Sequence, residues 1–245
     1  MTRDYATHPS LHDWENWQES NGINGYTWGS KHATGVATYF NQSRHDMGRH
    51  TVYSGGALRR VEEYNGTPAL DVLNYHSNSG HSFSRLDLAL DFINTGVTVE
   101  DFQNCYLNGE ADTRIKSATT TKSLTHKGET LYIGSMKRKK KLVRMYDKAS
   151  EQKLTGDWVR VETQIMGKPA TASAKAISTS ENYGKTAIGV MKDVCDFKTV
   201  KQWSDVTMNA EKVEIGTISS EKGDTRDWLL NQCIPALAKE VKARS

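Results

Sequence analysis

The chain has 245 residues, enough to bury a hydrophobic core as one large domain or two small ones. Hydrophobic residues make up 36% and charged residues 25% of the sequence, but ten tyrosines, six tryptophans and five phenylalanines argue against disorder. The net charge of +3 permits nucleic-acid binding without arguing for it, so a case for DNA must rest on local clusters of charge.

Cysteine spacing and hydropathy indicate the compartment. The three cysteines are isolated and form no CxxC pair, which fits a reducing cytoplasm better than a disulfide framework or a zinc site. The first residues lack an apolar signal region, and no apolar run approaches membrane-spanning length. We therefore expect a cytoplasmic protein that does not enter a membrane.

The first half of the chain predicts short strands and helices in alternation. Apolar spacing favours helices over 57–64 and 69–75. Thr98 is a candidate N-cap for a helix over 97–108, because Glu100 and Asp101 would then lie near the positive end of its dipole. The other predicted elements are a loop with a short helix over 1–20, strand-like stretches over 25–39 and from His50, and a strand over 84–92.

The second half predicts a hairpin, a further strand and then helices. Pro169 ends the last strand, and an Ala-rich helical region follows, with breaks expected at Gly184 and Gly189. The predicted elements are strands over 130–135, 142–148 and 158–165, a turn over 136–141, helices to about Asp193, and a last helix over 225–242. This order predicts an α+β fold, an antiparallel sheet packed with helices on one side.

Three of these strands alternate between apolar and polar residues, the period of a strand with one buried face. In 85–92, leucines and a phenylalanine oppose Arg85, Asp87 and Asp91. The polar positions thus repeat arginine with carboxylate, a mixture suited to holding a metal ion beside a phosphate. The polar residues of the other two strands are Arg144, Tyr146, Lys148, Arg160, Glu162 and Gln164.

The carboxylates of this face are candidate metal ligands. Asp87 and Asp91 are about 13 Å apart in an ideal strand, so one ion cannot easily take both. Asp87 with Glu162 from a neighbouring strand is a better oxygen-ligand pair for Mg²⁺ or Mn²⁺. The alternative is a surface ion-pair lattice between the acids and the arginines of the same face, Arg85, Arg144 and Arg160.

A run of five cations occupies the predicted hairpin turn. Such a tip can reach a DNA backbone and gain affinity by counterion release. A solvated turn without a ligand is the alternative. The run consists of Lys137, Arg138, Lys139, Lys140 and Lys141.

Two tyrosines are candidate nucleophiles. A tyrosine nucleophile needs an exposed hydroxyl near a cation, since the free phenol titrates near about pH 10. Tyr183 is followed by Lys185, and Tyr146 belongs to the polar face itself; an ordinary half-buried aromatic is the alternative for either. The sequence has no HExxH, Walker A, GxGxxG or GxSxG pattern, which makes a histidine-based metal centre or a nucleotide-hydrolysing motor poorly supported.

The motifs RLDLALDF, ETLYIGS, VRMYDKxxE and WVRVETQ, in this order, resemble the replication initiation factor family. That family includes rolling-circle plasmid initiators, replication proteins of filamentous phages, and relaxases of some conjugative elements. The resemblance covers about 80 residues well, from Arg85 to Gln164. Weaker similarities include Asn24-Gly-Tyr26, Tyr53 to Leu58, and Trp228-Leu before Ile234 to Leu237.

The resemblance implies a sequence-specific DNA nickase. Members cut one strand through a tyrosine, stay joined to the 5′ phosphate and later rejoin the ends. The implied fold is an antiparallel sheet with the layout of the HUH endonucleases, in which carboxylates replace histidines as metal ligands. Carried over by motif, the implied metal ligands are Asp87 and Glu162 with Asp91 as a third, and the implied basic positions are Arg144, Lys148 and Arg160.

The chain departs from the family pattern at the nucleophile. The resemblance places a tyrosine on a helix soon after the 158–165 strand, but residues 166–182 contain none. Tyr183 is the first one available, which assumes a longer connection. Tyr146 belongs to a shared motif and is better read as structural or phosphate-contacting.

The sequence therefore predicts a single replication-initiator domain over 1–245 that nicks and rejoins DNA with Mg²⁺ or Mn²⁺ to start rolling-circle replication. The expected partners are DNA at an origin, as a hairpin or single-stranded nick site, and a host helicase; a homodimer is left open. Two alternatives remain. One is a relaxase that mobilises a conjugative element, and the other is a non-catalytic origin-binding regulator on the same scaffold.

Overall fold

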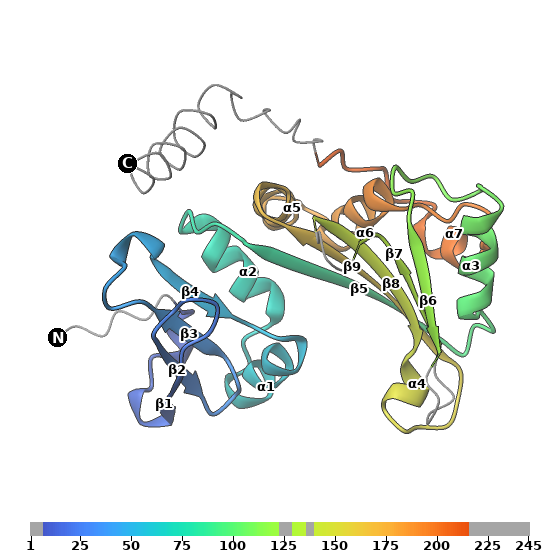
Figure 1. The fold of residues 1–245 in the computed structure, drawn as a ribbon. Helices are drawn as coiled ribbons and strands as arrows, with labels where there is room; N and C mark the ends of the chain where they lie inside the picture. The colour runs from blue at the N-terminus through green and yellow to red at the C-terminus, as the bar shows by residue number, and fades with distance from the viewer. Residues whose placement is uncertain (1–6, 123–128, 136–139, 216–245) are drawn as a thin grey trace, which may run out of the picture. The chain divides into compact units, whose positions relative to one another are not determined.

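Two antiparallel sheets and seven α-helices make up the α+β fold of the described residues, which confirms the predicted class (Figure 1). This computed structural model describes residues 7–122, 129–135 and 140–215. By their internal contacts these residues divide into two units. The N-terminal unit is residues 1–83 with 174–184, and the C-terminal unit is residues 84–173 with 185–245. The expectation of one functional domain over the whole chain stays a prediction.

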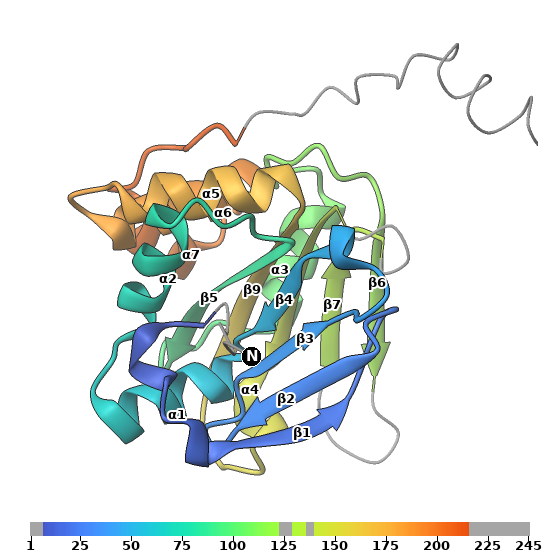
Figure 2. The same cartoon turned by 90° about the vertical axis from the view of Figure 1, so that its left-hand side faces the viewer.

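The N-terminal unit contains a four-stranded meander, in which neighbours in sequence pair antiparallel (Figure 2). Two helices follow it, and Ser54 caps the first by accepting a hydrogen bond from the Ala57 backbone N–H at 3.1 Å. The elements are β1 (Trp17–Asn21), β2 (Trp28–His32), β3 (Ala37–Phe40), β4 (Arg49–Val52), α1 (Gly55–Asn65) and α2 (Ala69–Asn78).

Small aliphatic side chains form the core of this unit. Trp17 and Tyr53 pack against a cluster of four fully buried residues, Leu11, Val36, Ala57 and Val61. Residues 174–184 belong to this unit, and the Ser178 hydroxyl donates to the Ser77 hydroxyl at 2.8 Å.

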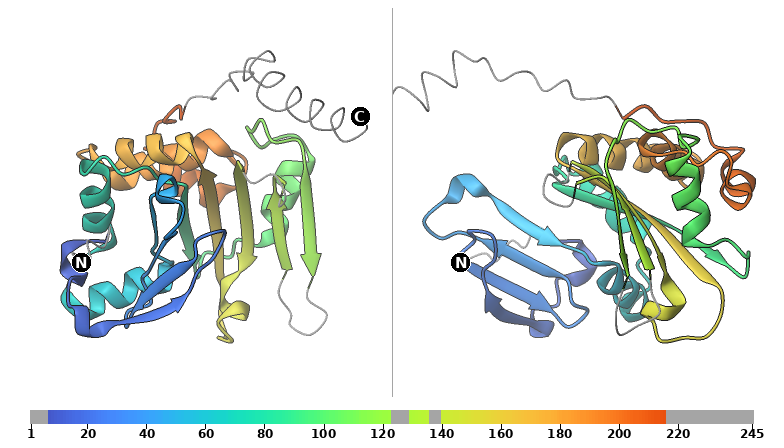
Figure 3. Two further views of the ribbon diagram at one scale, coloured as in Figure 1. Left: turned by 60° about the vertical axis from the view of Figure 1, so that its left-hand side comes forward. Right: turned by 45° about the vertical axis from the view of Figure 1, so that its right-hand side comes forward.

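The C-terminal unit contains a five-stranded sheet in the order β5-β9-β8-β7-β6, with β6 at its outer edge (Figure 3). Three of its helices, α3, α6 and α7, lie on one side of the sheet (Figure 1). The elements that lie wholly in this unit are β5 (Arg85–Ile93), α3 (Val99–Leu107), β6 (Ala118–Lys122), β7 (Glu129–Ile133), β8 (Lys141–Asp147), α4 (Lys148–Glu151), β9 (Trp158–Met166) and α7 (Lys201–Thr207). Helices α5 (Lys168–Ser178) and α6 (Tyr183–Val194) each have residues in both units.

Alternation along the central strands sorts side chains onto two faces. Most apolar residues of β5, β8 and β9 face the helices, where large aromatics complete the core, whereas Leu142 shares the face of Arg144. Phe102 packs edge-on against Phe197 with ring centres 5.0 Å apart, and Trp203 of α7 does the same at 5.3 Å. The polar residues of the same strands are therefore left on the opposite face.

The helix predicted over 97–108 is confirmed as α3, and so is its predicted N-cap, Thr98. Thr98 accepts a hydrogen bond from the Asp101 backbone N–H, and the Asp101 carboxylate accepts one from the Thr98 backbone N–H, which makes a complete capping box. The predicted hairpin of β7 and β8 is also present, although its tip over 136–139 and the predicted tail helix lie outside the described residues.

Some sequence expectations are wrong. Strands β1 and β6 and the one-turn helix α4 were not predicted, because these segments show no apolar alternation. The expected helix breaks at Gly184 and Gly189 do not occur, since α6 runs through both and the chain leaves the helix over 179–182 instead. A Cβ at Gly189 would collide with the carbonyl oxygen of Glu211, so this glycine permits close packing rather than a break.

Candidate functional site

The polar face of the C-terminal unit brings together the three predicted metal-ligand acids and the two predicted arginines. In the register of β5, β9 and β8, Ala89 and Arg144 flank Glu162, and Asp91 and Tyr146 flank Arg160. Directly opposed residues of antiparallel strands point to the same side of a sheet. Three strands that are far apart in sequence therefore bring their carboxylates and cations onto one surface.

Asp91 is held by two donors from β9. The Arg160 guanidinium binds it bidentately at 2.7 Å for each bond, and the Trp158 indole N–H donates to the same carboxylate at 2.7 Å. Burial raises the pKa of Asp91, but these hydrogen bonds and the charges of Arg160 and Lys148 outweigh it and lower the pKa overall. Asp91 is thus an ionised partner of Arg160.

Glu162 lies on β9, between β5 and β8, and accepts from two residues of β8. The Arg144 Nε donates to it at 2.5 Å, and the Tyr146 hydroxyl donates at 2.6 Å. Burial, followed by the hydrogen bond to Glu162 and its negative charge, raises the pKa of Tyr146. A phenolate at Tyr146 is therefore disfavoured. The prediction that this tyrosine is structural or phosphate-contacting stays a prediction.

Asp87 and Glu162 occupy diagonal positions on β5 and β9, because Asp87 is opposite Gln164 and Glu162 is opposite Ala89. Diagonal neighbours are about 7–8 Å apart, within reach of a shared small ligand. In the structure, however, Asp87 accepts from Arg85 Nε at 2.7 Å, so each of the three acids has an arginine partner. Within the described residues, no group of three or more histidines, cysteines or acids could hold a metal ion.

Lys148 differs from its predicted place on the strand. β8 ends at Asp147, which caps the short helix α4, and Lys148 is the first residue of that helix. Its side chain is nevertheless buried, with Nζ paired to Glu151 and 5.6 Å from the ring centre of Tyr146. Lys148 therefore borders the polar face from the end of β8.

The other predicted residues lie elsewhere. Tyr183 is the first residue of α6, belongs to the N-terminal unit and has a 54% exposed side chain. Of the basic run, residues 137–139 lie outside the described residues, Lys140 is exposed, and Lys141 pairs with Asp193 of α6 at 3.1 Å. Lys141 consequently joins a strand to a helix, unlike the free tip cation that the sequence suggested.

Sequence reasoning missed the contributions of Trp158 and Glu151. Trp158 shares the period-two pattern of Arg160 and Glu162, so the alternation could have placed it on the polar face. Glu151 comes within reach of Lys148 only because both residues lie on the one-turn helix α4. The alternation of apolar and polar residues in a strand does not predict this helix.

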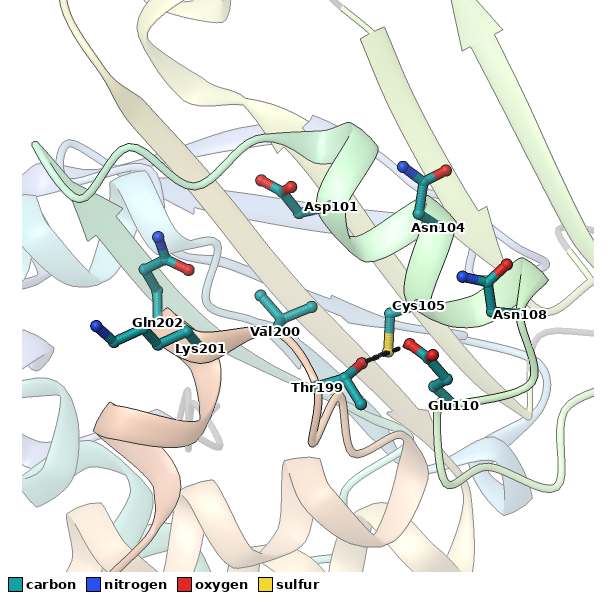
Figure 4. Close-up of a pocket in the computed structure, with 9 residues that line it drawn as sticks. All are labelled: Asp101, Asn104, Cys105, Asn108, Glu110, Thr199, Val200, Lys201 and Gln202. Carbon is teal, nitrogen blue, oxygen red and sulfur yellow. Dashed lines mark hydrogen bonds between the residues drawn. The ribbon is translucent and has the colours of Figure 1, made fainter.

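A cavity of about 330 Å³ lies between α3 and the start of α7, away from the polar face (Figure 4). Its lining is mostly polar, and Thr199 spans it by contacting Cys105 at 3.3 Å and Glu110 at 2.8 Å. Helix α3 packs on the apolar side of the sheet, so this cavity and the acid–arginine face are on opposite sides of the C-terminal unit.

These features define an antiparallel sheet that presents arginines and carboxylates on one face. A family model described as replication initiation factor matches residues 81–244, well over half of the chain. The chain therefore belongs to the replication initiation factor family. A search of curated proteins found no match. No helix among the described residues is long and apolar enough to span a membrane.

The fold is similar to a solved structure, that of the rolling circle replication initiator protein from Geobacillus stearothermophilus. The TM-score is 0.64 at 20% sequence identity, over 84% of this chain and 81% of that chain. At this identity the likeness shows a shared fold. Because residues from 81 onwards are fewer than 84% of the chain, the likeness also extends into the N-terminal unit.

Proposed function

We propose that this protein is a DNA-nicking and rejoining endonuclease that initiates rolling-circle replication. Family membership supports a role in replication initiation, and the fold likeness to a rolling circle initiator supports the rolling-circle mode. The observation that carries the proposal is the polar face, where three acids and their cationic partners meet on the family-matched strands β5, β8 and β9.

In the proposed reaction Tyr183 is the nucleophile. Its oxygen forms a bond to the scissile phosphorus and its proton is released, while the bond to the 3′ oxygen breaks and that oxygen gains a proton. The product is a 5′-phosphotyrosine and a free 3′ hydroxyl. The phosphodiester bond energy is conserved, so the reverse attack by a 3′ hydroxyl rejoins the strand without ATP.

The cations of the polar face would bind the phosphate. Arg144, Lys148 and Arg160 can offset the charge that develops on its non-bridging oxygens. In the structure each of these three cations is paired with a carboxylate of the protein. DNA binding would therefore require each cation to share its donors between that carboxylate and the phosphate. The fixed ion pairs keep the guanidinium groups oriented before DNA arrives.

Asp87 and Glu162 would hold Mg²⁺ or Mn²⁺. Asp91, the third acid implied by the family motif, is about 13 Å from Asp87 along β5 and would not easily share the same ion. A hard cation commonly uses one or two carboxylates and completes its shell with water and substrate phosphates, which fits two oxygen ligands on diagonal positions of one face. When bound, the ion would supply Lewis-acid polarisation of the phosphate. The arginine partners of both acids would have to give up part of their hydrogen bonding.

The decisive experiment uses supercoiled DNA that carries the origin of the host element. With Mg²⁺ or Mn²⁺, the wild-type protein should convert it to the open circle and form a covalent 5′ adduct, and Tyr183→Phe should do neither. The matched control is Tyr64→Phe, which removes the hydroxyl of another half-exposed tyrosine, on α1. If Tyr183→Phe still forms the adduct, the nucleophile is another tyrosine, and Tyr146→Phe is the next variant.

A second variant tests Glu162, the acid of β9. Glu162→Gln keeps the shape of the side chain but removes its charge, so it should retain DNA binding and lose cleavage. Gel-shift and nicking assays on the same substrate measure the two effects. Glu63→Gln, on the exposed surface of α1, is the control. Unchanged cleavage by Glu162→Gln would remove Glu162 from the reaction.

A non-catalytic origin-binding regulator is the second candidate. It is favoured by the pairing of Asp87, Asp91 and Glu162 with arginines, which would stabilise the scaffold without any reaction. Origin binding without nicking in either metal would establish it. A relaxase shares the proposed chemistry, and only the fate of the nicked strand separates it from an initiator.

A further inference from the structure

An apolar pair of residues lies at one end of the charged polar face. Ile93, the last residue of β5, is directly opposite Trp158, the first residue of β9. The next pair on the same face is Asp91 with Arg160, because side chains two residues apart along a strand point to the same side. Strand β5 is at the edge of the sheet, so the apolar pair occupies a corner of the polar face.

Both side chains of this pair are accessible to solvent. Ile93 is 56% exposed and is the largest apolar side chain among the polar-face positions of β5. Trp158 is partly exposed. A single exposed isoleucine is common on a protein surface. An isoleucine directly opposite a tryptophan instead makes one continuous apolar surface, since the Cβ atoms of such a pair are about 5 Å apart.

Charged groups hold the indole ring of Trp158 in position. Its N–H donates to Asp91 at 2.7 Å, and the Arg160 guanidinium lies over the ring, 5.7 Å from the ring centre. Arg160 in turn binds Asp91 through two hydrogen bonds of 2.7 Å. The three side chains therefore fix the ring beside a cation that is proposed to bind phosphate.

The placement of an apolar surface beside this cation indicates the chemistry of the ligand. Each nucleotide of a DNA strand carries an anionic phosphate and a flat base. Proteins that bind single strands combine cations for the backbone with aromatic side chains on which bases stack. Apolar side chains also hold bases that have turned out of a duplex. Within a duplex the base faces are covered by neighbouring bases, so only an unpaired base can use such a surface.

We propose that Trp158 and Ile93 form the binding site for one unpaired base of the DNA strand whose phosphate binds Arg160. The proposal rests on the proposed function in that DNA is the ligand of the polar face. The base contact makes this corner selective for unwound DNA. It adds affinity without counterion release, because it neutralises no phosphate.

The test compares two fluorescein-labelled strands that have the same phosphates and differ only in their bases. One is an oligothymidylate of about 20 nucleotides, long enough to cover a single-stranded binding site, and the other has an abasic sugar at every position. Fluorescence anisotropy in EDTA measures the affinity of the full-length protein for each strand. Trp158→Ala should weaken binding of the oligothymidylate about tenfold, since a stacked base is lost. Its affinity for the abasic strand should equal that of the wild type.

Two further variants separate stacking from the contact with Asp91. Trp158→Phe keeps an aromatic ring but loses the N–H donor, so its affinity for the oligothymidylate should stay within about threefold of wild type. Ile93→Ala should weaken that binding about threefold, since it removes part of the apolar surface. The matched control is Leu107→Ala, at a 68% exposed position of α3 on the other side of the sheet, which should change neither affinity.

Four results would overturn the proposal. They are wild-type protein that does not bind the oligothymidylate, Trp158→Ala with wild-type affinity for it, the same loss of affinity for the abasic strand, and an equal loss in Trp158→Phe and Trp158→Ala. The last result would show that Trp158 acts only through Asp91.

The nicking assay reports separately on the proposed function. Protein that shows the base-dependent effect of Trp158→Ala in EDTA but never nicks the origin would overturn the nickase alone. If the wild-type protein nicks the origin and Trp158→Ala binds the oligothymidylate equally well, only the base site is overturned.

Discussion

One polar network of the N-terminal unit joins histidines to a tyrosine hydroxyl, whereas the network of the polar face joins arginines to carboxylates. In the N-terminal unit, His76 contacts the Tyr53 hydroxyl at 3.1 Å and His81 at 2.9 Å. On the polar face, Arg160 binds Asp91 and Arg144 binds Glu162. Burial lowers the pKa of His76 and raises the pKa of Tyr53, which favours the neutral form of both. The pairs of the polar face are direct contacts between a guanidinium group and a carboxylate.

The cores differ in the same way. The N-terminal cluster consists of small aliphatic residues, while Phe92, Phe102, Phe197 and Trp203 dominate beneath the five-stranded sheet. A charged surface on one side of a sheet needs a rigid apolar layer on the other, because ion pairs keep their geometry only if the strands do not move. The C-terminal unit therefore holds charged groups in fixed positions. Its stability should respond to mutation and to pH differently from that of the N-terminal unit.

The largest effect is expected at the aromatic core. Trp203→Ala removes a side chain that is 1% exposed and packs against three phenylalanines, so it should lower the free energy of unfolding by about 4 kcal/mol. Urea unfolding followed by circular dichroism measures the change. Val206→Ala, at a 48% exposed position of the same helix, should stay within about 0.5 kcal/mol of wild type. Equal effects at the two positions would contradict this account of the core.

The histidine network should make the N-terminal unit sensitive to mild acid. Burial, followed by the nearby charges of His81 and His8, lowers the pKa of His76 to about 4. The unfolded chain binds a proton near its ordinary value of about 6.5, so it binds more protons than the folded chain between these two values. Stability should therefore fall as pH falls from about 6.5 to about 4, by about 3 kcal/mol.

Urea midpoints measured from about pH 4 to about pH 7.5, a range that spans both pKa values, test this dependence. His76→Gln should reduce the slope of stability against pH in that window. His45→Gln changes an exposed histidine of the same unit and should leave the slope as it is. An unchanged slope in His76→Gln would show that another group binds the protons.

The ion pairs of the polar face should give a smaller effect that appears at lower pH. The folded-state pKa of Asp91 is lowered, so its contribution is present above the ordinary carboxylate pKa and is lost as pH falls through the folded value. Arg160→Ala should cost about 1 kcal/mol at neutral pH, because Asp91 loses a bidentate partner at a partly exposed site. Arg44→Ala breaks an exposed pair with Asp46 and should change nothing measurable. Equal losses in the two variants would show that burial does not strengthen the Arg160 pair.

The alternation of charged and apolar residues sufficed to predict β5, β8 and β9 and the two faces of their sheet, since period two is a local property of the chain. The capping residues of α3 were predictable for the same reason. Strand β6, by contrast, is Ala-Thr-Thr-Thr-Lys and exposed throughout, so only its pairing with β7 makes it a strand. Gly189 was predicted to break a helix, because local sequence shows only that glycine disfavours helix interiors. Its actual reason is the close approach of Glu211, which lies beyond α7 and is seen only in the folded chain.

The sequence alone predicted the charged residues of β5, β8 and β9 that share the polar face and suggested the family, although it misplaced Lys148 and missed Trp158. The arginine partners of Asp91 and Glu162 were decided by strand register, because one step of slippage would exchange them, whereas Asp87 pairs with Arg85 of its own strand. The same register set Ile93 opposite Trp158 at a corner of the polar face. Long-range pairing of strands is a property of the folded chain, and no local pattern of residues specifies it.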